Sequence, residues 1–283
     1  MKAIFYRAST RRARVQHEAW QAGLAKHGLE LPSRKEEDYS GVEADVAIFY
    51  GLQGNLRRVM AEYAAAGKTA VFVDLGFWGR VEDDKVLGFH RLAVNAKHAT
   101  GYFQKIKHPA DRWSYFGRAC KPFTRSGRHV LLCGMSAKAS WVYEMGPEEW
   151  ERRAAKTLRE TTLRPILYRP KPSWRDASPI KGTSFMYTKD DIRDMLVNCW
   201  AVATHHGNTA LDALIEGVPA FCEDGLASVL CPADLKGIEA PHFPDEAARE
   251  QLLCDAAYTQ YKVNEIAEGK AWAYLRDEGL VPG

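Results

Sequence analysis

The stretch "ATHHGNTALDALIEGVP" (residues 203–219) joins a short apolar run to a helical pattern through a polar turn. The run that leads into it, "WAVAT", predicts a buried strand, and "TALDALIEG" has the apolar spacing of a helix. In open α/β sheets, ligands bind beyond the carboxyl ends of the strands. A helix N-terminus at that place offers backbone N–H groups to an anion. The stretch therefore predicts a ligand-facing strand–turn–helix unit.

Strands and helices alternate along the rest of the chain. The other main predicted strands are "KAIFY" (2–6), "ADVAIFYG" (44–51), "KTAVFVDLGFWG" (68–79), "HVLLCG" (129–134) and "RPILYRPKPS" (164–173). This alternation implies right-handed βαβ units and mainly parallel sheets.

A cluster of Gly, Pro, Ser, Lys and Arg near residues 118–128 predicts a domain junction. We expect an N-terminal domain of residues 1–125 and a C-terminal domain of residues 126–283, with the last helix a candidate to cross back. The alternative is a single doubly wound domain with long insertions.

Composition excludes several classes of protein. The chain has 283 residues, of which 46% are hydrophobic and 27% charged, so it has enough apolar side chains for a sizeable core. No apolar run approaches the roughly 18–20 residues of a transmembrane helix, so we expect no membrane partner. The six cysteines form no CxxC pair, which favours reduced, buried thiols over zinc ligation.

The charge is unevenly distributed. Residues 1–128 contain 22 Lys and Arg against 13 Asp and Glu, whereas the remainder contains 17 against 23. Arg11, Arg12 and Arg14 follow the first predicted strand, where they could grip the phosphates of an acceptor. The segment "KIKHPADRWSYFGRACK" (105–121) interleaves basic and aromatic residues, as nucleic-acid-binding surfaces do. The alternative for both is ordinary solvated surface.

Residues 205–212 carry the chemistry of the opening stretch. Asn208 or Thr209 can cap the helix, and Gly207 lets the backbone approach a ligand closely. His205 and His206 could donate hydrogen bonds to phosphate oxygens. A capped helix followed by a Gly–Pro turn explains the same residues without a ligand.

This segment resembles the donor-binding segment of GT-B glycosyltransferases, especially the pattern Ser/Asn-Ser/Thr…(G)xEALxxGxPV of capsule-type and Kdo-transferring members. The resemblance implies two Rossmann-like domains facing a cleft. It places Asn208 and Thr209 at the donor phosphates, Asp212 at the ribose hydroxyls, and Gly217 and Pro219 at the closing turn. The sequence departs from the pattern in having Asp212 where the family has Glu, and in its two preceding histidines.

Two further loops follow strands of the second half. "YRPKP" (168–172) is similar to the KPHP-like segment of the same families without its histidine, which assigns Arg169 and Lys171 to the donor diphosphate. In "CGMSAKASW" (133–141), Ser136 and Lys138 could reach a phosphate or the donor sugar. A rigid basic loop and an ordinary strand–helix turn are the alternatives.

Glycosyl transfer by inversion needs a base for the acceptor hydroxyl. Asp74, at the end of a predicted strand, is the first candidate and His90 the second; Asp74 could instead cap a turn or pair with Arg80. No DxD-like metal motif follows a suitable strand, so we expect neither a metal nor a cofactor besides the nucleotide sugar.

The sequence therefore predicts a metal-independent, cytoplasmic glycosyltransferase with a nucleotide-sugar donor. The basic first half, the small size and the tail "NEIAEGKAWAYLR" also resemble bacteriophage proteins, which implies hydroxymethylated DNA as one acceptor and the host cytoplasm as the location. The alternatives are a sugar-nucleotide epimerase or hydrolase, and a non-catalytic protein that binds a nucleotide or DNA.

Overall fold

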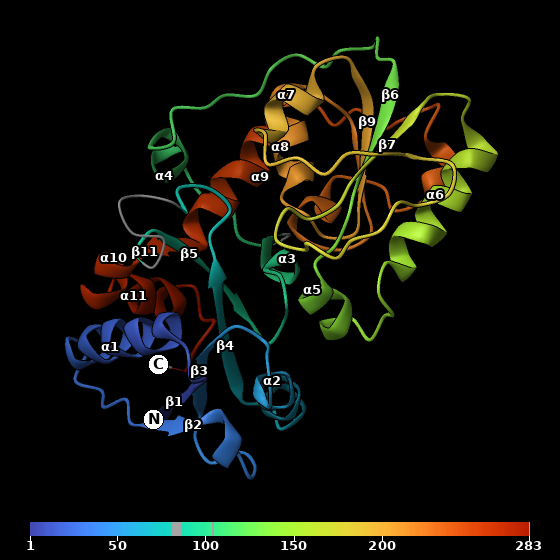
Figure 1. Cartoon of the computed structure of the whole chain (residues 1–283). Coiled ribbons are helices and arrows are strands. Elements are labelled where there is room, and N and C mark those ends of the chain that lie inside the picture. Colours follow the sequence, from blue (N-terminus) through green and yellow to red (C-terminus); the bar gives the residue numbers. More distant parts are fainter. Residues whose placement is uncertain (81–86, 104, 283) are drawn as a thin grey trace. The chain divides into compact units, whose positions relative to one another are not determined.

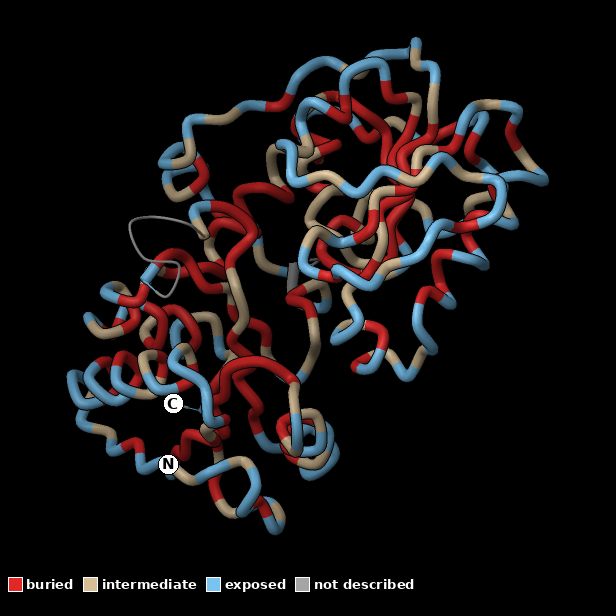
Figure 2. Tube along the Cα trace, in the orientation of Figure 1, coloured by how far each residue is buried: buried red, intermediate tan, exposed pale blue. Residues whose placement is uncertain are grey.

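The computed structural model describes residues 1–80, 87–103 and 105–282. The chain divides into two compact units (Figure 1). The first contains residues 1–108 and 255–283, and the second contains residues 109–254. In both units the central strands are largely buried (Figure 2).

The sheet of the first unit has the strand order β11-β5-β4-β3-β1-β2. Its strands are β1 (Ala3–Arg7), β2 (Ser33–Lys35), β3 (Val46–Tyr50), β4 (Thr69–Leu75), β5 (Phe89–Val94) and β11 (Gln260–Lys262). The strands β1 to β4 are parallel, whereas β5 pairs antiparallel with both β4 and β11. The apolar sequences of β1 and β3 are almost fully buried, as expected for parallel strands covered on both faces.

Short and long helices complete the first unit. They are α1 (Arg11–Ala25), the 3₁₀ helix η1 (Glu36–Asp38), α2 (Leu56–Ala65), α3 (Thr100–Phe103), α10 (Val263–Ala267) and α11 (Lys270–Asp277). The side chain of Thr10 caps α1 by accepting a hydrogen bond from the backbone N–H of Ala13. Gly23 lets α1 approach α10 closely, because a Cβ atom there would lie 2.1 Å from the carbonyl oxygen of Ile266.

The sheet of the second unit has the order β10-β9-β6-β7-β8, and all its strands are parallel. They are β6 (His129–Cys133), β7 (Ile166–Arg169), β8 (Ser184–Phe185), β9 (Cys199–Thr204) and β10 (Ala220–Cys222). The helices are α4 (Asp111–Ser114), α5 (Ala137–Val142), α6 (Glu149–Thr161), α7 (Ile192–Leu196), α8 (Thr209–Glu216), η2 (Leu226–Val229) and η3 (Leu235–Gly237). A further helix, α9 (Glu246–Tyr258), begins in the second unit, and its residues after 254 belong to the first. Val130 and Leu132 of β6 pack in one core with Trp150 and Leu158 of α6.

The expectation of two Rossmann-like α/β units is confirmed, and the single-domain alternative is excluded. The division nevertheless differs from the expected boundary at residues 125/126. Residues 109–125 belong to the second unit, where Lys121 donates from its backbone N–H to the carbonyl of Ile215 at 2.7 Å. The chain after residue 254 belongs to the first unit, because β11 pairs with β5. The expected return of the last helix to the N-terminal domain therefore includes the strand β11 as well.

Candidate functional site

Three loops of the second unit start side by side at the carboxyl edge of its sheet. Cys133, the last residue of β6, lies opposite Arg169 of β7 on one side and Thr204 of β9 on the other. The structure therefore brings together the segments 134–138, 170–172 and 205–209, which the sequence singled out separately.

The loop after β6 is held by the carboxyl group of Glu151, a residue that no sequence pattern singled out. Gly134 donates from its N–H to the carbonyl of Arg169 at 2.9 Å, and Met135 donates to Oε1 of Glu151 at 2.5 Å. Ser136 then caps α5, accepting from the N–H of Ala139 at 3.1 Å. Lys138 is exposed on the first turn of α5. A rigid turn thus presents the small residues of this loop at the edge.

Glu151 is a fully buried acid on α6. Burial raises the pKa of this carboxyl group, since a charge is poorly solvated there. Its Oε2 atom and the hydroxyl of Tyr168 have no hydrogen-bond partner among the described residues. Both side chains lie against Gly134, where a Cβ atom would be 3.1 Å from Glu151 Oε1 and 3.2 Å from the Tyr168 hydroxyl. A lone glutamate at an otherwise ordinary helical position gave no sequence signal for this role.

The loop after β7 supplies positive charge. Arg169 donates from Nη2 to the carbonyl of Asp190 at 2.9 Å, while its buried Nε has no hydrogen-bond partner among the described residues. Burial raises the pKa of the Cys133 thiol to about 11, and Arg169 and Lys171 both oppose that shift. Arg169 lies opposite Cys133 in the register of β6 and β7, and Lys171 follows it two residues later in the loop.

In the turn after β9, His205 and His206 pack against Tyr143, and Asn208 precedes the first residue of α8. His205 is buried, with its ring centroid 4.4 Å from that of Tyr143, and its Nδ1 lies 2.9 Å from Nδ1 of His206. His206 is partly exposed and stacks on Tyr143. Of the two histidines, His206 is therefore the one placed to meet a ligand, and His205 supports it through packing.

The start of α8 lacks a side-chain cap. Asn208 occupies the N-cap position, yet its side chain makes no capping hydrogen bond. The side chain of Thr209 lowers the pKa of the Cys133 thiol against the effect of burial. Gly207 is required sterically, since a Cβ atom would lie 2.7 Å from Oγ1 of Thr204. The first N–H groups of α8 have no intrahelical acceptor, as at any helix start.

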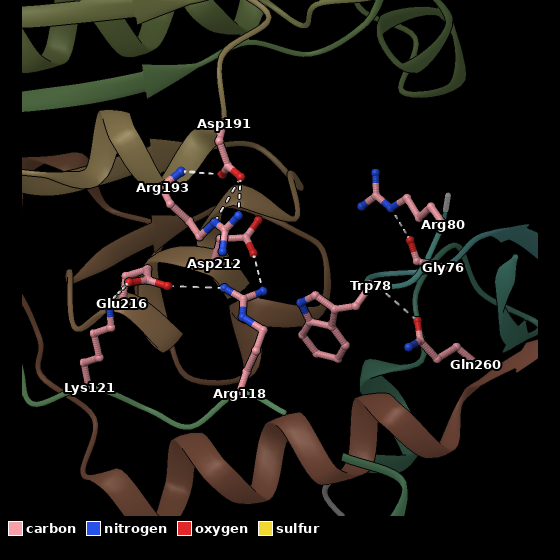
Figure 3. A network of polar contacts seen from close by, with 10 residues as sticks. All are labelled: Gly76, Trp78, Arg80, Arg118, Lys121, Asp191, Arg193, Asp212, Glu216 and Gln260. Carbon is pink, nitrogen blue, oxygen red and sulfur yellow. Dashed lines mark hydrogen bonds and ion pairs between the residues drawn. The ribbon is translucent and has the colours of Figure 1, made fainter. Parts of the chain in front are cut away.

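Asp212 and Glu216 share one face of α8, as their spacing predicts, and both bind Arg118 (Figure 3). Nη1 of Arg118 donates to Asp212 Oδ1 at 3.1 Å, and Nη2 donates to Glu216 Oε1 at 3.4 Å. Lys121 forms a further ion pair with Glu216. Arg118 lies in the basic and aromatic segment 105–121, which we interpreted as a nucleic-acid surface. In the structure Arg118 pairs with the acidic face of α8, and the nucleic-acid interpretation of the segment stays a prediction.

The first unit brings both candidate bases to one polar cluster. Asp74 accepts from Nη2 of Arg91 at 3.3 Å and from the N–H of Leu75 at 2.9 Å, and its side chain is 36% exposed. The pairing with Arg80 considered from the sequence is not its contact: Arg80 donates to the carbonyl of Gly76. Asp74 thus presents a partly exposed carboxylate near the end of β4.

His90 differs from Asp74 in being fully buried. Its Nδ1 lies 2.9 Å from the carbonyl of Gly88, and burial lowers the pKa of the ring to about 4. Its ring centroid is 5.8 Å from that of Tyr50, which also makes a side-chain hydrogen bond with Arg12. A neutral imidazole is a possible proton acceptor, but burial keeps this one away from an acceptor hydroxyl in the described conformation.

The three arginines expected in the loop after the first strand lie on the first turns of α1, where their side chains differ in surroundings. Arg12 faces inward to Tyr50, whereas Arg11 and Arg14 line a pocket at the start of α1. Within the described residues we find no helix long and apolar enough to cross a membrane. The same residues contain no group of three or more His, Cys, Asp or Glu side chains that could hold a metal ion.

No protein-family model and no curated protein matches this sequence. Solved structures do match. The chain is similar to a β-Kdo 2,4-transferase, KpsC of Thermosulfurimonas dismutans, with a TM-score of 0.56 and 12% identity over 94% of this chain and 98% of that one. It is also similar to the β-Kdo 2,7-transferase of KpsC from that organism, with a TM-score of 0.52 and 11% identity over 96% and 99% of the two chains. At such identities the likeness concerns the fold, and the chain has the GT-B fold of these glycosyltransferases.

Proposed function

We propose that this protein is a glycosyltransferase that moves a sugar from a nucleotide-sugar donor to an acceptor hydroxyl. The observation that carries the proposal is the edge of the second sheet. The loop after β7, with Arg169 and Lys171, and the start of α8, where Asn208 makes no side-chain cap, follow the strands that flank β6. The likeness in fold to two Kdo transferases supports the same reaction class.

In this proposal the donor phosphate lies between the β7 loop and α8. Arg169 can donate from its unpartnered Nε, Lys171 adds a point charge, and the N–H groups at Asn208 and Thr209 complete the site. Cleavage of the sugar–phosphate bond builds negative charge on the departing nucleotide. Fixed donors aimed at that charge lower the barrier, so this arrangement requires no metal.

The remaining donor contacts follow from the neighbouring loops. Ser136 and Lys138 lie after β6 on the sugar or phosphate side, with His206 and Gly207 next to the phosphate. Asp212, one turn into α8, would accept hydrogen bonds from the ribose hydroxyls. Arg118 orients this carboxylate, since it binds Asp212 and Glu216 together.

For the acceptor hydroxyl we propose Asp74 as the base, because its carboxylate is partly exposed while His90 is buried. A hydroxymethylated base in phage DNA is one acceptor to be tested with this enzyme. The reaction would transfer the hydroxyl proton to Asp74 as the acceptor oxygen attacks the anomeric carbon and the nucleotide leaves.

The test combines binding and turnover. Thermal unfolding is measured with CMP, UDP, GDP and dTDP and their sugar conjugates, since a ligand that binds only the folded state raises Tm. We expect one nucleotide family to raise Tm, and Lys171→Met to remove most of that shift. Lys156→Met, at an exposed lysine of α6, removes the same charge from the same unit and should leave the shift intact.

The family identified in this way is then used as donor with hydroxymethylated DNA and with sugar acceptors. Release of the nucleotide together with a glycosylated product supports the proposal. A folded protein that responds to none of the nucleotides would overturn it. Binding with no transfer, or release of the sugar to water alone, would favour a binding protein or a hydrolase.

A further inference from the structure

The first unit has a pocket of about 280 Å³ at the start of α1, formed by the end of β1, the following loop and β2. It is lined by Arg7, Ala8, Ser9, Thr10, Arg11, Arg14 and Lys35. Four of these seven residues are cations and none is acidic. The pocket is therefore strongly positive for its size.

Backbone geometry gathers these side chains. Strands β1 and β2 are parallel, and Arg7 lies opposite Lys35 in their register. The chain then turns through residues 8–10 into α1, so Arg11 and Arg14 follow within one helical turn. Thr10 satisfies the N–H of Ala13, whereas the N–H groups of Arg11 and Arg12 precede the first intrahelical hydrogen bonds.

The charges at the start of α1 have the unfavourable sign for a helix. A helix N-terminus carries partial positive charge and favours acidic residues, but the first turn of α1 contains no acid. Among the described contacts of this loop, Oε1 of Glu37 accepts from the Ser9 hydroxyl at 3.5 Å. An anion in the pocket would offset the repulsion among the four cations and the helix start.

We propose that this pocket binds a phosphate group carried by a compact acceptor molecule. That the ligand is the acceptor rests on the proposed function, whereas phosphate binding follows from the pocket alone. Arginine can donate two parallel hydrogen bonds to phosphate, and lysine adds a point charge. The volume holds one phosphorylated group, while a polynucleotide would need a groove that tracks successive phosphates.

Isothermal titration with inorganic phosphate, glucose 6-phosphate and a single-stranded oligonucleotide tests this inference. We expect glucose 6-phosphate and free phosphate to bind, with glucose 6-phosphate tighter than the oligonucleotide per site. Arg14→Gln and Lys35→Met should each raise Kd for glucose 6-phosphate about tenfold or more, and both together by more than either alone. Lys26→Met is the matched control, because Lys26 is an exposed cation at the other end of α1.

The inference is overturned if neither phosphate nor glucose 6-phosphate binds the folded protein, or if Lys26→Met weakens binding as much as Lys35→Met. It is also overturned if the oligonucleotide binds tightly and the two small probes do not. The result is separable from the proposed function. Phosphate binding without glycosyl transfer contradicts only the transferase, and transfer by a protein that binds no phosphate contradicts only the pocket.

Discussion

The helices α8 and α1, which start at the candidate sites, carry side chains of opposite charge near their N-termini. At α8 the first turn contains an acid, Asp212, and the cations come from the neighbouring loop after β7. At α1 the helix itself carries the cations, with Arg11, Arg12 and Arg14 in its first turns and no acid among them. The first arrangement agrees with the helix dipole and the second opposes it.

The contrast does not extend to buried polar atoms. The acids of α8 are paired, with Arg118 binding both Asp212 and Glu216. Both units nevertheless bury polar atoms without hydrogen-bond partners among the described residues: Nε2 of His90 in the first unit, and Oε2 of Glu151 and Nε of Arg169 in the second. Such groups cost stability. The units therefore differ in how charge is arranged at the two helix starts, and both carry the cost of unsatisfied buried groups.

The largest predicted effect concerns catalysis. The proposed base belongs to the first unit and the proposed donor site to the second, so a change at one should leave the other intact. Asp74→Asn should reduce turnover by about 10²–10⁴-fold, the usual contribution of a general base, and leave the donor Kd unchanged. Steady-state rates and donor titrations on the same preparation measure both quantities. Asp277→Asn makes the same change at an exposed aspartate of the first unit and should have little effect. A loss of less than tenfold would remove Asp74 from the mechanism.

The buried imidazole of the first unit should make that unit sensitive to acid. The folded-state pKa of His90 is about 4, below its ordinary value of 6.5, so the stability it contributes is present above pH 6.5. This stability is lost as the pH falls from 6.5 through 4, and amounts to about 3 kcal/mol for a shift of this size. Urea unfolding between pH 7 and pH 4 measures it. His90→Gln, which can still donate to the Gly88 carbonyl, should flatten the dependence, and His242→Gln at an exposed site should not. Equal slopes in all three proteins would mean that other groups control the acid response.

In the second unit the buried acid Glu151 should lower the stability of the protein as the pH rises, whereas His90 lowers it as the pH falls. Its folded pKa is raised, so its stability contribution is complete below the unfolded value of 4.5 and is lost as the pH rises through the folded pKa. Glu151→Gln keeps an acceptor for the Met135 N–H and should remove this loss. Glu151→Ala leaves that N–H unsatisfied and should destabilise the protein by about 2 kcal/mol at pH 7. Chemical unfolding of the two variants at pH 5 and pH 8 separates the effects, and an alanine variant as stable as the glutamine variant would contradict the role of Glu151 in holding the loop.

The sequence was sufficient for features that depend on local pattern. The alternation of strands and helices predicted both sheets, and the parallel register of β6, β7 and β9 then places Cys133, Arg169 and Thr204 in one row. Spacing alone also placed Asp212 and Glu216 on one face of α8. These predictions hold because residues close in sequence determine them.

Contacts between distant segments could not be read from the chain. Arg118 meets Asp212 across 94 positions, and Gln260 accepts from the N–H of Phe77 across 183. The unit boundary was misplaced for the same reason: a Pro- and Gly-rich stretch near residue 120 suggests a linker, yet its backbone hydrogen-bonds to α8. The difference in burial between His205 and His206 could not be predicted either, because nothing in "HHGN" indicates that Tyr143 and Trp150 pack against His205.

The smallest predicted effect tests whether Arg118 stabilises the protein by neutralising Asp212 and Glu216 on α8. Arg118→Gln should destabilise the protein by about 1 kcal/mol, because it leaves two carboxylates one turn apart without their shared, partly buried cation. Adding Glu216→Gln should recover part of that loss, since it removes the repulsion between Glu216 and Asp212. Arg153→Gln, which breaks an exposed pair with Glu223, should cost less than the first variant. The four unfolding free energies of the cycle measure the coupling directly. If Arg118→Gln and Arg153→Gln cost the same, and Glu216→Gln recovers nothing, the acidic face of α8 does not depend on Arg118, and the two helix starts differ less than their sequences indicate.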